Sequence, residues 1–180
     1  MNAFIVLTFI GEDRPGLIRS LSQTVVSHGG NWLGSRSARL AGKFAGILHA
    51  SVPEDHAEEL IAELNKFDER GLSVVVERTT PSPARGRFRR LRLDLIGNDR
   101  PGIVHDIARA LAERQINVDE LETTCVSAPM SGEMLFHARA RVHIPTTTDL
   151  ARLRAGLERL ANDLVVEIRL GPTPESKRGS

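Results

Sequence analysis

The sequence predicts an α+β protein made of two copies of one βαββαβ unit, each folded as a four-stranded antiparallel sheet with both helices on one face. A nine-residue segment occurs twice, as IGEDRPGLI at residues 10–18 and as IGNDRPGIV at residues 96–104. An apolar, strand-like run precedes each copy, and apolar residues at helical spacing follow it. The length of 180 residues suits two small domains.

The repeat extends well beyond this segment. A shift that places residue 10 on residue 96 aligns residues 4–31 with residues 90–117 without a gap. Within residues 10–16 the two copies differ only at Glu12, and the asparagines that follow the helix, Asn31 and Asn117, also align. Such a regular repeat indicates duplication of a whole folding unit.

The first strand of each copy is predicted at residues 3–10 and 90–96. In the second copy leucines alternate with charged residues, which is typical of a half-buried strand. In the first copy, FIVLTFI is apolar on both faces. We therefore expect something beyond its own helices, such as a second subunit, to cover one face of that sheet.

Helices follow the repeated segment, because apolar residues recur there at every fourth position. They are Leu17, Leu21 and Val25 in the first copy, and Ile103, Ile107 and Leu111 in the second. Strands are then expected at 31–41 and 44–52, and at 117–127 and 133–144. The segment FHARARVHI shows strict alternation of apolar and polar residues.

A second helix and a closing strand complete each unit. The helix stripes are Leu60, Ile61, Leu64 and Phe67, and then Leu150, Leu153, Leu157 and Leu160. The last strands are expected at 72–77 and 164–170. The order βαββαβ predicts the ferredoxin-like arrangement, with domains at 1–79 and 90–170, a Pro- and Arg-rich linker at 80–89 and a flexible tail at 171–180.

Composition argues against several classes of protein. The net charge of +1 gives little support for direct nucleic-acid binding. A single cysteine, Cys125, favours the cytoplasm, and no apolar run approaches the roughly 20 residues of a membrane helix. His137 and His143 lie about 20 Å apart along a strand, too far to share a metal. No motif for a catalytic nucleophile or a cofactor occurs, so we expect no enzyme, no cofactor and no metal site.

The DRPG turn is the candidate functional site. Asp13 and Asp99 are expected to cap the helices that follow, with Pro15 and Pro101 in the first helical turn. Glycines on both sides of the turn would let a ligand approach the backbone. Free N–H groups at a helix start favour a carboxylate, and a neighbouring Asp or Asn can accept from an ammonium group. Together these features suit an amino acid.

A strand, the pattern G-x-D-R-P-G, an apolar helix and an Asn that opens the next strand resemble the ACT domain family in both copies. The tandem pair of this length looks most like the glycine cleavage system transcriptional repressor family. ACT domains are regulatory modules, many of which bind amino acids where the turn of one domain faces the second strand of a neighbour. The resemblance therefore implies these ligand-binding residues: Gly11, Asp13, Arg14, Pro15, Gly16, Leu17, Asn31, Gly97, Asn98, Asp99, Arg100, Pro101, Gly102, Ile103 and Asn117.

The resemblance implies a cytoplasmic, homodimeric sensor of glycine or another small amino acid, which controls transcription through a regulator protein. Ligand binding would change the affinity for that partner. The alternative is a module that binds no ligand and serves as an interaction surface, in which DRPG has a purely structural role.

Overall fold

The computed structural model describes residues 1–80, 88–128 and 132–172. The chain divides into two compact units, Met1–Pro83 (unit 1) and Ala84–Ser180 (unit 2). Most of the predicted linker and tail, residues 81–87 and 173–180, lies outside the described residues.

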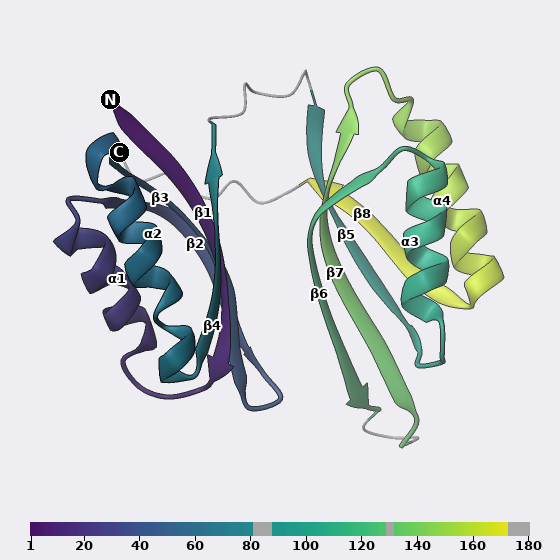
Figure 1. The fold of residues 1–180 in the computed structure, drawn as a ribbon. Helices are drawn as coiled ribbons and strands as arrows, with labels where there is room; N and C mark the ends of the chain where they lie inside the picture. The colour runs from purple at the N-terminus through teal and green to yellow at the C-terminus, as the bar shows by residue number, and fades with distance from the viewer. Residues whose placement is uncertain (81–87, 129–131, 173–180) are drawn as a thin grey trace. The chain divides into compact units, whose positions relative to one another are not determined.

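Each unit has the predicted order of elements (Figure 1). Unit 1 contains β1 (Asn2–Glu12), α1 (Leu17–Ser27), β2 (Asn31–Leu40), β3 (Lys43–Pro53), α2 (Ala57–Asn65) and β4 (Leu72–Thr79), with short 3-10 turns at Glu54–His56 and Asp68–Arg70. Unit 2 contains β5 (Phe88–Asn98), α3 (Ile103–Glu113), β6 (Asn117–Ser127), β7 (Met134–Pro145), α4 (Leu150–Leu164) and β8 (Val166–Pro172).

The strands form one antiparallel sheet per unit, in the order β2-β3-β1-β4 and β6-β7-β5-β8. In each unit both helices cover the same face of the sheet (Figure 1). The predicted fold class, two ferredoxin-like units with four-stranded sheets, is confirmed.

The core of each unit lies between the helices and the sheet. On β1, alternate residues Ile5, Leu7 and Phe9 are buried, as the two-residue period of a strand requires. On β7 the alternation of FHARARVHI is confirmed, since Phe136 and Ile144 at its two ends are buried. The predicted helix stripes also pack inward: Leu17, Leu21 and Val25 on α1, and Ile103, Ile107 and Leu111 on α3.

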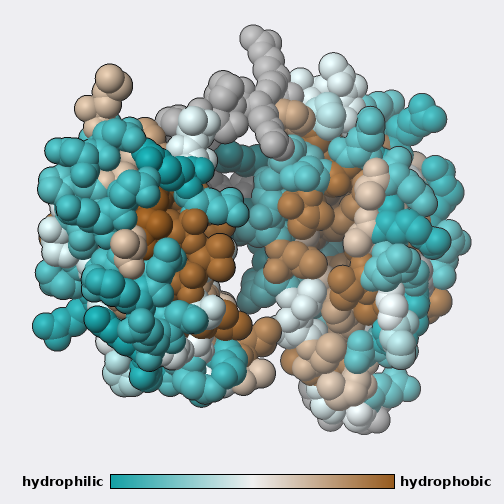
Figure 2. Space-filling view, viewed as in Figure 1, coloured by the Kyte–Doolittle hydropathy of each residue, from teal (hydrophilic) through white to brown (hydrophobic). Residues whose placement is uncertain are grey.

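The face of the unit 1 sheet that points away from the helices carries apolar side chains. Ile10, Ile47 and Val75 are 51%, 46% and 60% exposed, and they lie together because Thr8 pairs with both Ile47 and Val75. Hydrophilic and hydrophobic residues are both visible on the surface of each unit (Figure 2). Coverage of this apolar face by another subunit stays a prediction.

Over the described residues, no helix has both the length and the apolar composition to cross a lipid bilayer.

Candidate functional site

The two DRPG segments form the same turn. Gly16 has φ 94° and ψ −2°, and Gly102 has φ 86° and ψ −2°. These angles match the third position of a type II β-turn, with proline at the second position. In unit 2 the Ile103 N–H donates to the Arg100 carbonyl at 3.3 Å, which closes the turn. Glycine is needed at the third position because its backbone is left-handed.

The prediction that Asp13 and Asp99 cap the helices is wrong. The N-caps are Gly16 and Gly102, neither of which supplies a side-chain cap. A complete β-turn separates each Asp from its helix, so Pro15 and Pro101 also precede the N-cap instead of standing in the first helical turn. The backbone N–H groups of the two Asp residues have other acceptors: Gly42 O at 3.1 Å for Asp13, and Met134 O at 2.8 Å for Asp99.

The glycines around each turn serve two different purposes. A Cβ at Gly11 would lie 2.7 Å from the Gly71 carbonyl oxygen, and one at Gly97 would overlap Val166. These two glycines therefore permit close packing against the neighbouring strand, β4 or β8. At Gly16 and Gly102 a Cβ would meet no other atom within 4 Å, so the backbone at the start of each helix is accessible.

The arginines of both turns have partners. Arg14 donates to the Arg70 carbonyl. Arg100 donates to the Asp106 carboxylate at 2.7 Å. The hydrogen bond from Arg100 is the main reason why the pKa of Asp106 lies below its ordinary value, with smaller contributions from the charges of Arg100 and Arg109. Both side chains therefore form hydrogen bonds within their own unit.

The two units differ at the carboxylate of the turn. Asp13 forms an ion pair with Arg39 at 2.8 Å. The equivalent of Arg39 in unit 2 is Cys125, because Arg39 pairs with Phe44 opposite Gly11, and Cys125 pairs with Phe136 opposite Gly97. Within the described part of unit 2 no cationic side chain pairs with Asp99.

The pKa of the Cys125 thiol is affected by this carboxylate. Desolvation raises the pKa of Cys125 most, although the residue as a whole is exposed, and the charge of Asp99 and a hydrogen bond to it raise the pKa further. All three effects favour the neutral thiol. Cys125 is therefore poorly suited to act as a nucleophile.

Asn31 and Asn117 lie far from the turn of their own unit. Asn31 pairs with Ser51, which also pairs with Phe4, whereas Gly11 at the turn pairs with Phe44. Seven residues along β1 separate these ends, which is about 23 Å for a strand. In unit 2, Asn117 donates to Asp119 at 3.2 Å. A ligand shared by a turn and an Asn must therefore join different modules.

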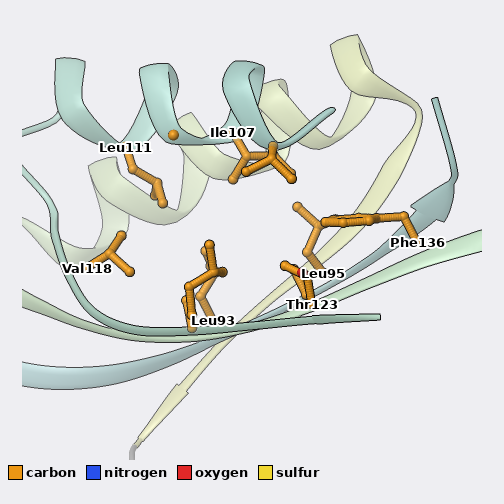
Figure 3. A pocket seen from close by; sticks show the side chains of 12 residues that line it. Leu93, Leu95, Ile107, Leu111, Val118, Thr123 and Phe136 are labelled. Carbon is orange, nitrogen blue, oxygen red and sulfur yellow. The ribbon is translucent and has the colours of Figure 1, made fainter. Parts of the chain in front are cut away.

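Unit 2 also contains an apolar cavity of about 40 Å³ that the sequence did not predict (Figure 3). We call it the unit 2 cavity; it lies between α3 and the β5-β7-β6 part of the sheet. Its lining is Leu93, Leu95, Val104, Ile107, Ala108, Leu111, Val118, Leu121, Thr123, Phe136, Ala138 and Ala140.

Among the described residues, no group of three His, Cys, Asp or Glu side chains is arranged to hold a metal ion.

Arg39, Cys125 and the cavity are the features that sequence reasoning missed. Residue 39 falls on residue 125 under the same shift that aligns the two DRPG segments. Extending the alignment past residue 31 would have paired the two residues, but only the strand register shows that both lie beside the Asp of the turn.

Comparison with known proteins identifies the family of both units. The ACT domain family matches residues 3–77 and residues 91–160. The glycine cleavage system transcriptional repressor of Escherichia coli (strain K12) is 25% identical over 162 residues, which cover 89% of this chain and 85% of that protein. The protein of the same description from Shigella flexneri matches to the same extent.

The fold of the whole chain is also found among solved structures. A protein of unknown function from Galdieria sulphuraria has a TM-score of 0.83 at 27% identity, with 97% of this chain and 100% of that chain covered.

Proposed function

The chain belongs to the ACT domain family and is similar to the glycine cleavage repressor, and from this premise we propose that it senses a small amino acid and thereby controls transcription through a protein partner. The amino acid, glycine or another small one, binds at the DRPG turn of one module and reaches the Asn at the start of the second strand of a neighbouring module. The sensor acts as a homodimer in the cytoplasm, binds no nucleic acid directly and catalyses no reaction.

The observation that carries the proposal is the environment of Asp99. A zwitterion needs donors for its carboxylate and an acceptor for its ammonium group. The accessible backbone at Gly102 and the start of α3 supplies donors, where a negative charge gains roughly 0.3–1 kcal/mol from the helix dipole. The Asp99 carboxylate, without a paired cation in the described part of unit 2, supplies the acceptor.

Unit 1 is less suited to this role. Arg39 already compensates the charge of Asp13, so an ammonium group would have to compete with a guanidinium. We therefore assign the ligand to the turn of unit 2, with Asn31 or Asn117 supplied by another module.

Ligand binding changes the affinity for the partner through the contact between two modules. Because the turn and the Asn of one unit lie at opposite ends of its sheet, a ligand that contacts both favours the arrangement that brings two modules together. A change in partner affinity follows only if that arrangement binds the partner differently.

Calorimetric titration with the twenty amino acids tests the proposal. Wild-type protein should bind at least one of them, and Cys125→Arg should bind it at least about tenfold more weakly, because it places beside Asp99 the cation that Arg39 provides in unit 1. Cys125→Ser is the matched control and should bind as the wild type does. The absence of heat with every amino acid at millimolar concentration, or equal affinity in Cys125→Arg, contradicts the proposal.

A second function, a ligand-free interaction module, is favoured by one observation. The exposed apolar set of Ile10, Ile47 and Val75 is a surface that a protein partner could cover. Under that function Val75→Asp abolishes partner binding, and no amino acid alters it.

A further inference from the structure

Three positions that line the unit 2 cavity carry smaller side chains than their equivalents in unit 1, although Leu111, Leu121, Thr123 and Ala138 are larger than their equivalents Val25, Ser35, Ser37 and Gly46. The shift that aligns the copies places Phe9 on Leu95 and Trp32 on Val118. Strand register places Leu48 on Ala140, since Leu48 pairs with Leu7 and Ala140 with Leu93. At each of these three positions unit 2 carries the smaller side chain.

The larger residues pack into the core of unit 1. Phe9 and Leu48 are buried there, and Trp32 is a partly buried residue that packs against the same core. A Cβ at Gly46 would overlap the Phe9 ring, so that ring fills the space above its strand neighbour. Unit 2 has smaller side chains at these three positions, and the cavity is space that its own residues do not fill.

That space is suited to an apolar group. Thr123 is the one polar residue in the lining, whereas an ordered water needs two to four polar partners. The labelled side chains of the sheet and of α3 point into the same space: Leu93, Leu95, Ile107 and Leu111 (Figure 3). At roughly 10–15 Å³ per probe sphere, a cavity of this size has room for about three or four heavy atoms.

The cavity is accessible from the side of the DRPG turn. Val104, Val118 and Leu121 line it along α3 and the edge strand β6 and are 43%, 37% and 52% exposed, with Val104 near the turn and Val118 toward the opposite end of the sheet. Val104 follows Gly102 by two residues, and Phe136, at the same end of the lining, pairs with Gly97. A group held at the turn is therefore next to the end of the cavity lined by Val104 and Phe136.

We propose that the unit 2 cavity receives the aliphatic side chain of the bound amino acid, so that the ligand is a branched aliphatic amino acid of the valine, leucine and isoleucine class. This inference rests on the proposed function, because the turn holds the α-ammonium and α-carboxylate groups while the cavity selects the side chain. Glycine leaves the cavity empty, and an aromatic ring exceeds it.

Titration of the full chain with glycine, valine, isoleucine and phenylalanine tests this selection. Valine or isoleucine should bind wild-type protein at least about tenfold more tightly than glycine or phenylalanine, since one methylene in an apolar pocket is worth roughly 10- to 200-fold. Val118→Trp and Ala140→Leu, which install the unit 1 residues, should each lose that preference.

A control variant and a second cavity variant complete the test. Ala112→Leu is the matched control, because it adds the same side chain to an exposed position of α3 outside the lining, and it should keep the wild-type preference. Val118→Trp changes a partly exposed position of the lining, so it tests the cavity even if Ala140→Leu does not fold. Glycine binding as tightly as valine, or an unchanged valine preference in Val118→Trp, overturns the inference and leaves the proposed sensor intact. Absence of binding by any amino acid overturns both.

Discussion

Gly11 and Gly97 are required by contacts within the chain itself. We expect Gly11→Ala to lower the free energy of unfolding of unit 1 by about 1–3 kcal/mol, because its Cβ would overlap the Gly71 carbonyl and force the backbone to shift. Urea unfolding followed by the fluorescence of Trp32, which packs against the core of unit 1, measures the change. Gly34→Ala, at an open position of the same unit without a positive φ, should unfold as the wild type does. Equal stability of Gly11→Ala and wild type would show that the strand contact can relax.

Cys125 offers a direct readout of the charge at Asp99. Its pKa is raised by desolvation and then by Asp99, so its thiolate fraction should stay below that of a free cysteine until the pH exceeds the ordinary thiol range. The rate of alkylation, measured against pH, should show this displacement. Asp99→Asn should move the profile part of the way back to lower pH, because it removes the charge but not the desolvation. An identical profile in Asp99→Asn would mean that the carboxylate does not face the thiol.

At this scale the sequence predicts which residues form the turn but not what each one does. The DRPG segment, its glycines and the downstream asparagines are visible as a repeat. The predicted cap at Asp13 was wrong because the left-handed Gly16 inserts a β-turn between Asp and helix. The partners Arg39 and Cys125 come from distant strands, and only the register of β2 and β6 brings them to the turn.

Among the elements, α4 has the side-chain cap that α1 and α3 lack. The Asp149 carboxylate accepts from the N–H groups of Ala151 at 2.9 Å and Arg152 at 3.2 Å. Asp149→Ala should therefore lower the free energy of unfolding of unit 2 by about 1 kcal/mol. Asp99→Ala removes no cap and should cost less, as circular dichroism during urea unfolding can measure. A larger loss in Asp99→Ala than in Asp149→Ala would contradict the assignment of both helix starts.

The start of α3, which has no side-chain cap, is stabilised by the ion pair between Arg100 and Asp106. Because the pKa of Asp106 is lowered in the folded state, the pair stabilises unit 2 at pH values above the ordinary aspartate pKa, and that contribution disappears as the pH falls through the lowered value. We expect wild type to be more stable than Asp106→Asn at neutral pH, with a difference that shrinks in acid. Urea unfolding of both proteins across this pH range measures the difference. A difference that is constant or grows below the ordinary aspartate pKa would contradict this pairing.

Element order and type could be predicted from the sequence because local periodicity determines them. Both helix stripes and the alternation of β7 follow directly from apolar spacing. The register shifts between Trp32 and Gly34 and between Val118 and Glu120 could not be predicted, since they arise from pairing with β3 and β7. These shifts set which residues of β2 and β6 face the helices, and thus where the cavity opens.

At the scale of the whole molecule, duplication provided two similar units that have diverged in one region. Unit 1 has an ion pair at its turn and an exposed apolar sheet face, whereas in the described part of unit 2 no cation pairs with Asp99 and an apolar cavity lies under α3. The duplication itself was visible in the sequence. The replacement of Phe9 and Trp32 by smaller residues is visible in the same alignment, but the positions of Arg39 and Cys125 beside the turn are not, because they depend on the strand register. We infer that unit 1 provides the interaction surface and unit 2 the ligand site.

The most direct test of this division is a map of backbone amide chemical shifts during titration with valine and, separately, with glycine. The account predicts saturable shifts at Asp99, Arg100 and Gly102 and along the cavity, with much smaller shifts at the equivalent turn of unit 1. Saturable shifts confined to unit 1 or remote from both turns would contradict it, and so would the absence of any shift at millimolar amino acid.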